Sequence, residues 1–319
     1  MKKTLILLVV LTFYHSYSQE KQLDEVKVQA TQKGLKKSIK GTSNTTIVSS
    51  KELLKAACCN LAESFETNPS IDVNFSDALT GTKQIKMLGL TSPYIMITEE
   101  NIPSVRGASQ AYGLSFTPGT WVESIQITKG AGSVVNGYES ISGQINTELL
   151  KPMKDIPFFL NAYGSSDSRF ELNTHFNKKL SEKWATSLFV HGNARVVKND
   201  MNDDGFLDNP LGKQFNIANR WQYTDSQTGW VSFLNFRFMK DEKQIGQLDF
   251  EPDRDKFTTN YWGSEINTER FDFASKVGYV WASMPFQSIG FQNAFSNHIQ
   301  QSYFGFNQYD IHQQSYYSN

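Results

Sequence analysis

Long segments in the second half of the chain alternate between apolar and polar residues. Between residues 169 and 180, Phe170, Leu172 and Phe176 share one face, and Glu171 and Asn173 share the other. Comparable alternation returns over residues 184–196, 215–223, 230–238, 271–281 and 289–295. Period-two runs that follow one another in this way predict antiparallel strands, about seven of them within residues 157–319.

The segments that connect these predicted strands alternate in length. Residues 181–183, residues 225–229 and the neighbourhood of Pro285 are short, whereas residues 198–213 and 241–269 are long and polar. Short turns at one rim and long loops at the other are typical of outer-membrane β-barrels, and a secreted β-sandwich is the alternative. An odd set of strands leaves sheet edges unpaired, so we expect an incomplete barrel from the front part of a longer chain.

The first half of the chain has a different pattern. Residues 42–150 contain a β-branched run at 45–49, helix signals near 50–54 and 61–65, and then several short strand-like runs. We therefore expect a compact α/β domain ahead of the barrel strands. Four glycines between residues 129 and 147 predict tight turns, and without a GxxxxGK[ST] pattern we expect no nucleotide site.

The N-terminus has the features of a secretory signal. Lys2 and Lys3 supply the positive start, and residues 5–11 (LILLVVL) form an apolar core too short to span a bilayer. Ser16 and Ser18 are small residues suited to cleavage, which places the start of the mature protein near residue 19. We expect an exported protein.

Composition narrows the class of protein. Lys and Arg number 31 against 32 Asp and Glu, so no overall basic field indicates nucleic-acid binding. A mean hydropathy of −0.44 excludes a bundle of membrane helices, although barrel strands, which alternate, remain compatible with it. Aromatic residues make up 13% of the chain, which fits a barrel with aromatic belts.

Residues 19–41 are polar and contain one short alternating run, residues 23–30 (LDEVKVQA). Such a run within a polar segment is suited to adding a strand to the sheet of a partner protein. An ordinary first strand of the α/β domain is an equal alternative.

These features together resemble the TonB-dependent outer-membrane receptors, especially those of Bacteroidetes. Residues 23–30 resemble a TonB box, residues 42–150 resemble the plug domain, and residues 124–147 (SIQITKGAGSVVNGYESISGQINT) are similar to the plug signature. The resemblance implies a mainly β protein with an N-terminal α/β plug followed by an antiparallel transmembrane barrel of about 22 strands in the whole family member. The domains expected are a signal peptide at 1–18, a TonB-box segment at 19–41, a plug at 42–152 and the first barrel strands at 153–319.

The resemblance also implies function and partners. The chain is expected to import a scarce ligand across the outer membrane, most often a ferric siderophore or another metal complex, and not to be an enzyme. Outer-membrane lipid surrounds the barrel, and periplasmic TonB, energised by ExbB and ExbD, pulls on the plug. The residues expected to pair with TonB are Leu23, Asp24, Glu25, Val26, Lys27 and Val28. A non-transporting adhesin or binding protein is the alternative class, and it would need no such coupling strand.

Residues 99–103 (EENIP) occupy the place where the family often has an Asp-Gly-x-Pro turn. One segment departs from the family pattern. Met87-Leu88-Gly89 stands where the family commonly has Ile-Arg-Gly, which removes the arginine of a plug–barrel contact.

Cys58 and Cys59 are the only cysteines, and they are adjacent. Thiolates suit Cu(I), and Met87 and Met96 could add thioether ligands, so a copper importer that uses this pair is an alternative function. A vicinal disulfide and two small packed residues are the other interpretations.

Residues 200–208 form a second candidate metal site. Asp200, Asn202, Asp204 and Asp208 place oxygen ligands at spacings that match the first half of a calcium-binding loop, but the closing glutamate is missing because position 12 is Leu211. The alternative is a solvated acidic loop on the outer face. No other cofactor is expected, and the scattered histidines form no catalytic arrangement.

Overall fold

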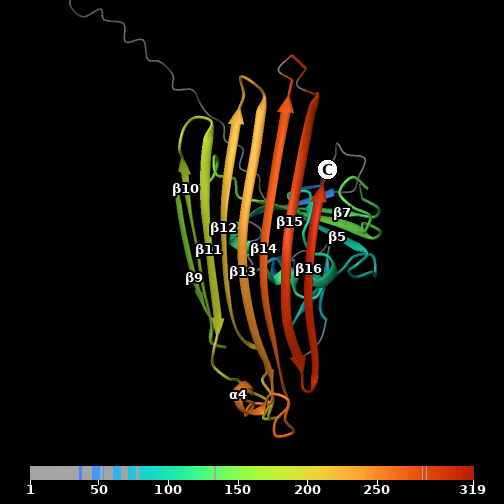
Figure 1. The fold of residues 1–319 in the computed structure, drawn as a ribbon, viewed down its shortest axis with the longest axis vertical. Coiled ribbons are helices and arrows are strands. Elements are labelled where there is room, and N and C mark those ends of the chain that lie inside the picture. The colour runs from blue at the N-terminus through green and yellow to red at the C-terminus, as the bar shows by residue number, and fades with distance from the viewer. Residues whose placement is uncertain are drawn as a thin grey trace, which may run out of the picture. The chain divides into compact units, whose positions relative to one another are not determined.

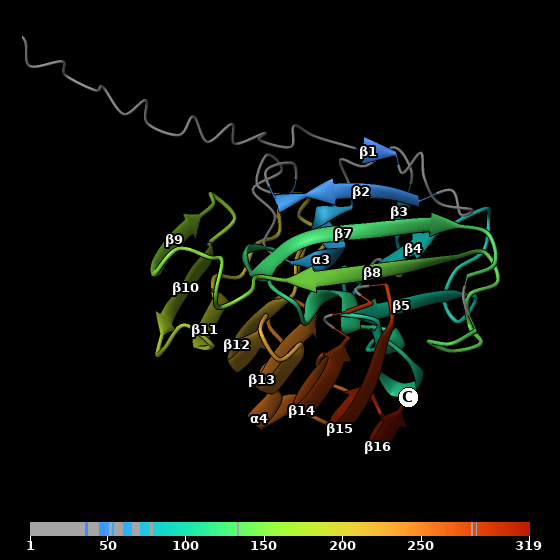
Figure 2. The same ribbon diagram turned by 90° about the horizontal axis from the view of Figure 1, so that it is seen from above.

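The computed structural model describes residues 36–37, 45–50, 53, 60–65, 71–76, 79–132, 134–281, 283–284 and 286–319. The signal segment, the TonB-box candidate at 23–30 and the pair Cys58-Cys59 lie outside these residues. The described residues contain two main sheets, one in the N-terminal domain and one of long strands (Figures 1 and 2).

The N-terminal domain is built on a six-stranded sheet in the order β1-β2-β7-β8-β5-β6 (Figure 2). All neighbours are antiparallel except β5 and β8, which run parallel. The strands are β1 Lys36–Lys37, β2 Thr45–Ser49, β5 Ile95–Glu99, β6 Ile102–Pro103, β7 Val122–Lys129 and β8 Gly143–Leu149. The α/β character expected from the sequence is confirmed.

Short elements cover this sheet. Strands β3 (Asp72–Phe75) and β4 (Lys83–Lys86) form a separate hairpin, and three 3₁₀ turns follow at η1 (Gly107–Gln110), η2 (Gly113–Ser115) and η3 (Gly119–Trp121). The expected helix at 61–65 is present as α3, Leu61–Ser64. It begins at Asn60 because the Asn60 side chain accepts a hydrogen bond from the Glu63 amide at 3.1 Å.

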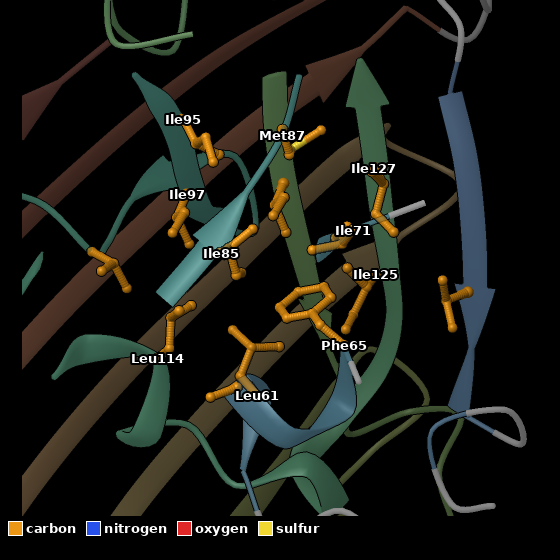
Figure 3. Packing of buried hydrophobic residues seen from close by; sticks show 14 of the residues in the cluster. Leu61, Phe65, Ile71, Ile85, Met87, Ile95, Ile97, Leu114, Ile125 and Ile127 are labelled. Carbon is orange, nitrogen blue, oxygen red and sulfur yellow. The ribbon is translucent and has the colours of Figure 1, made fainter. Parts of the chain in front are cut away.

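The core of the domain lies between α3, the β3–β4 hairpin and the six-stranded sheet. Figure 3 shows Leu61 and Phe65 of the helix segment beside Ile85 of β4 and Ile125 and Ile127 of β7. All five side chains are buried. This apolar cluster gives the N-terminal domain a core of its own.

The second sheet contains eight long antiparallel strands that pair in sequence order (Figure 1). They are β9 Phe158–Gly164, β10 Arg169–Lys179, β11 Trp184–Arg195, β12 Leu211–Asp225, β13 Trp230–Gly246, β14 Gly263–Val280, β15 Ser288–Phe304 and β16 Asn307–Ser318. The expectation of about seven strands was therefore one short. Strand β16 is polar on both faces over much of its length, and it pairs with β15 without a clear alternation of apolar and polar residues.

The connections alternate between two rims, as expected. Turns 180–183, 226–229 and 281–287 lie at one end, which we name the short-turn rim. The long loops 196–210 and 247–262 lie at the other end, the long-loop rim, and the second of them contains the short helix α4, Pro252–Asp255. This alternation follows from strands that run antiparallel in sequence order.

The two faces of the long-stranded sheet differ in chemistry. The outward face exposes apolar side chains, and at the short-turn rim Trp184 stacks on Tyr223 (4.9 Å between ring centroids) and Trp230 on Tyr279 (5.1 Å). Aromatic rows of this kind are typical of the membrane–water interfaces of β-barrels.

Within the described part of the chain, no helix is long and apolar enough to cross a membrane.

Candidate functional site

The turn between β5 and β6 presents two carboxylates to the long-stranded sheet. Glu100 and Asn101 have positive φ angles of 52° and 64°, which suits the tight turn of a β-hairpin. Asn146 fixes this turn, because its side-chain oxygen accepts hydrogen bonds from the Asn101 amide (2.7 Å) and from Thr98 Oγ1 (2.9 Å). The positions of Glu99 and Glu100 are therefore set by the N-terminal domain itself.

Glu100 is held by two cations of the long strands. Arg220 of β12 donates from Nη2 to Glu100 Oε1 at 2.5 Å, and Arg220 is almost fully buried. Lys276 of β14 donates to the Glu100 carbonyl and lies 3.8 Å from its carboxylate. Burial by itself would raise the pKa of Glu100, but the charges of Arg220 and Lys276 outweigh it and hold this pKa below its usual value.

Glu99 occupies a different electrostatic environment although it is the adjacent residue. Arg237 of β13 lies 3.3 Å from its carboxylate, and Thr117 donates a hydrogen bond at 3.3 Å. Here burial dominates over the attraction of Arg237, so the pKa of Glu99 is raised. The two neighbouring carboxyls therefore differ in how strongly each favours its charged form.

Arg237 connects several groups at this contact. Its guanidinium donates to Asn216 Oδ1 (3.1 Å), to Thr117 Oγ1 (3.1 Å) and to the Phe116 carbonyl, and it lies 5.5 Å from the ring of Trp121. The planar fork of an arginine can satisfy several acceptors at once, which explains how this side chain is buried.

Further polar contacts join the domain to the sheet over several strands. They run from Arg169 to Glu63 (2.8 Å), from Gln214 to the Ser115 carbonyl (3.3 Å), from Arg270 to the Ser104 carbonyl (3.2 Å) and from the Ala108 amide to Gln313 (2.7 Å). The interface therefore depends mainly on hydrogen bonds and ion pairs, with an apolar contact between Trp121 and Phe189 (5.5 Å between ring centroids). Polar contacts of this kind can be exchanged for hydrogen bonds to water, unlike a close-packed apolar core.

A polar cavity of about 280 Å³ lies nearer the long-loop rim. The β3–β4 hairpin approaches this rim closely, since a Cβ at Gly81 would lie 3.7 Å from Pro210. Lys243 lies 5.1 Å from the ring of Tyr112 at this cavity. The cationic side chains that line the cavity are Lys83, Arg169, Arg195, Lys213 and Lys243, beside the acidic Glu63, Asp241 and Glu242.

The candidate calcium residues lie in loop 196–210 at the long-loop rim. Asp200 accepts hydrogen bonds from the amides of Asp204 (3.2 Å) and Gly205 (2.9 Å), Asp204 from that of Phe206 (2.8 Å), and Asp208 from that of Met201 (2.7 Å). Asn202 donates to Asp204 at 2.9 Å. The carboxylates therefore stabilise the loop backbone, and across the described residues no three His, Cys, Asp or Glu side chains are grouped to hold a metal ion.

Sequence reasoning missed Arg220, Arg237 and Lys276. It noted only that Leu88 replaces the arginine of Ile-Arg-Gly, and Leu88 is indeed exposed. The structure makes an ionic contact elsewhere, with the acids on the N-terminal domain and the arginines on the strands. The sequence did contain a signal for these residues. All three cations occupy positions on the polar, inward-facing side of strands in which apolar and polar residues alternate.

The comparison with protein families gives the identity of the domain. Residues 37–144 match the TonB-dependent Receptor Plug Domain. The N-terminal domain is therefore a plug domain of the TonB-dependent receptor type. The long-stranded sheet that follows this plug domain has the fold of the first part of the barrel in receptors of this type. A search of curated proteins with the sequence found no match.

Solved structures with this fold include three of known ligand class. The ferric-catecholate import receptor Fiu of E. coli K12, in its open form, aligns with a TM-score of 0.61 at 14% identity, over 87% of this chain and 44% of Fiu. The siderophore receptor PirA of Acinetobacter baumannii gives 0.59 at 13% identity, over 86% and 43%. The copper transporter OprC gives 0.51 at 12% identity, over 85% and 50%. The chain therefore spans about half the length of these receptors or less, and identities this low establish the fold alone.

Proposed function

We propose that the receptor imports a metal complex across the outer membrane, with a ferric siderophore as the leading ligand class. The observation that carries the proposal is the plug–barrel contact, in which Glu99 and Glu100 of the plug meet Arg237 and Arg220 of the barrel wall. A plug held by ion pairs and hydrogen bonds can be displaced at moderate cost, which an importer needs and a static adhesin does not.

The polar cavity at the long-loop rim is our candidate for ligand capture. Its lining carries five cations and three acids, which favours an anionic complex. Fiu and PirA, which share the fold, are receptors for ferric catecholates and siderophores.

Coupling would use the segment ahead of the plug. We propose that Leu23, Asp24, Glu25, Val26, Lys27 and Val28 pair with periplasmic TonB, which ExbB and ExbD energise, after the signal at 1–18 has been cleaved. Strand addition uses main-chain hydrogen bonds, so the backbone of this segment should matter more than its side chains.

Copper import is the second candidate function. The adjacent thiols of Cys58 and Cys59 are ligands that Cu(I) favours, and the copper transporter OprC shares the fold. The two candidate functions differ in the ligand and share the import mechanism.

Growth tests separate the candidates. A strain that lacks the receptor is supplied with ferric siderophores, copper or cobalamin as limiting nutrient, and the full-length gene is returned as wild type or as Glu100→Gln. Restored growth on one source by the wild-type gene identifies the ligand class. Two results together would instead favour the adhesin. The strain without the receptor would grow equally on every source, and the receptor would not fractionate with the outer membrane.

A further inference from the structure

The two long loops of the barrel are fastened to each other. The Leu207 amide donates to the Gly246 carbonyl at 2.9 Å, and the Leu248 amide donates to the Gly205 carbonyl at 2.8 Å. Lys198 of the first loop adds a hydrogen bond to the Leu248 carbonyl at 2.8 Å. Backbone pairing between two loops gives a fixed frame, on which a binding site can be held in one geometry.

The second loop forms a pocket of about 240 Å³ with the turn between β15 and β16, and we name it the rim pocket. Phe250 and Tyr303 are buried at its base, whereas Phe257, Tyr261 and Phe306 are exposed. Gly263 permits this arrangement, because a Cβ there would lie 2.2 Å from the Phe250 ring. The pocket therefore combines a packed base with exposed aromatic walls.

Phe257 adopts an unfavourable backbone conformation at this pocket. Its φ angle is +59°, in the left-handed region that bulky residues rarely occupy. The neighbouring turn enforces it, since the Thr258 amide donates to the Asp255 carbonyl at 3.0 Å. The Phe257 ring meets Tyr303 at 5.2 Å between centroids yet stays exposed to solvent. A strained residue that displays an exposed ring points to a role beyond packing.

The rim pocket opens on the outer surface of the barrel wall. Arg270 points inward, because it donates to Ser104 of the plug, and side chains alternate along a strand, so Glu265 and Phe271 point outward. Tyr303 is the register partner of Glu265 and donates to its carboxylate at 2.9 Å. A molecule in this pocket is therefore outside the lumen, and is not cargo on its way through the barrel.

The position along the strand places the pocket beyond the membrane. Phe271 belongs to the outward apolar face, and the outward residues that follow toward the long-loop rim are Glu269, Asn267 and Glu265. From Phe271 to Glu265 the strand covers six residues, roughly 20 Å of length. The rim pocket therefore faces the layer just outside the outer leaflet, where glycans of the cell surface lie.

Charge restricts the kind of ligand. Residues 247–262 contain four acidic and two basic side chains, which disfavours an anion. The Lys256 ammonium already lies over the rings of Tyr303 (4.5 Å) and Phe257 (5.3 Å), so a cationic ligand would have to displace it. A neutral sugar ring is not repelled by charges of either sign, and its C–H face can pack on aromatic rings while its hydroxyls bond to Thr258 and Thr259 in the lining.

We propose that the rim pocket binds a neutral hexose unit of a surface glycan. Occupancy would fix the receptor laterally among its neighbours at the cell surface, apart from ligand import. The proposal rests on the outer-membrane location given under the proposed function and on the geometry and charge of the loop, and it does not depend on the identity of the transported ligand.

The test uses full-length receptor in a detergent that has no sugar headgroup. The methyl glycosides of glucose, galactose and mannose serve as probes, and binding is followed by saturation-transfer NMR. We expect saturable binding of at least one glycoside with a Kd in the millimolar range, about 1–10 mM. Phe257→Gly should weaken it by about tenfold or more, and because glycine adopts positive φ without strain, the loop should keep its conformation.

Two controls keep the test decisive. Phe286→Ala removes a fully exposed aromatic ring at the opposite, short-turn rim and should leave binding unchanged. Protease resistance of residues 247–262 shows that the loop of the Phe257→Gly variant is intact. Absence of saturable binding for all three glycosides would overturn the proposal, as would a Phe257→Gly variant with an intact loop that binds like the wild type. Growth on the imported nutrient should be the same for wild type and Phe257→Gly, which separates this site from the import function.

Discussion

Replacing Glu100 by glutamine should loosen the plug far more than the same replacement at Glu99. Glutamine keeps the size of the side chain and removes its charge, so Arg220 would be left buried with a neutral partner. The separation of 2.5 Å corresponds to an attraction of about 7 kcal/mol at an effective dielectric constant near 20. Desolvation of both groups offsets much of this attraction. The net free energy of the pair is therefore taken from mutations that remove one partner of a buried ion pair.

Removing one partner of a buried ion pair costs about 3–5 kcal/mol. Glutamine still accepts a hydrogen bond, so we expect the lower end, about 3 kcal/mol, or roughly a hundredfold shift toward the undocked plug. Glu99 is the matched control, because burial raises its pKa and its surroundings therefore tolerate a neutral side chain. For Glu99→Gln we expect a change below about 1 kcal/mol.

Amide hydrogen exchange of residues 95–103 in the full-length receptor measures this opening directly. Protection of these amides should fall in Glu100→Gln and remain near the wild-type level in Glu99→Gln. Equal protection in Glu100→Gln and the wild type would refute the role that we assign to the Glu100–Arg220 pair.

The pH dependence supplies a second readout with a definite sign. A carboxyl whose pKa is lowered on folding stabilises the folded state above its unfolded pKa and loses this contribution as the pH falls through the folded pKa. The difference between wild type and Glu100→Gln should therefore be complete at neutral pH, shrink below pH 4.5, and vanish once Glu100 is protonated. Glu99, whose pKa is raised, should show the opposite sign: its contribution is complete below pH 4.5 and is lost as the pH rises through its folded pKa.

Three further predictions concern residues named from the sequence. Val26→Pro should abolish ligand uptake but not surface binding, because proline removes a ladder donor, whereas Lys27→Ala should do little; wild-type uptake by the proline variant would exclude strand addition. Calcium should raise the protease resistance of the full-length receptor near residue 205, and Asp204→Ala should remove this effect; no response in the wild type would leave a solvated acidic loop. If Cys58 and Cys59 form a copper site, titration of the reduced receptor with Cu(I) should show tight binding that is lost when both are replaced by serine, and equal binding by both proteins would exclude the site.

The sequence by itself determined the two-part architecture. A strand with one apolar and one polar face is the structure that such alternation predicts. In β10 the apolar face carries Phe170, Leu172 and Phe176, and the polar face carries Glu171 and Asn173. Unequal connections fixed which rim carries the long loops. Strand β16 shows no clear alternation, and its place in the sheet is set by backbone pairing with β15, which a polar segment does not reveal.

The contacts that connect plug and barrel were decided only by the tertiary structure. Glu100 and Arg220 are 120 residues apart, and an acidic turn or an inward arginine has many possible partners until the register of β12 is known. The rim pocket depends in the same way on loop 247–262 meeting the turn between β15 and β16 in space, so Phe257 looks like an ordinary loop residue in the sequence. Periodicity records which face of an element is buried, whereas an ion pair or a pocket depends on distances between elements, which only the folded chain sets.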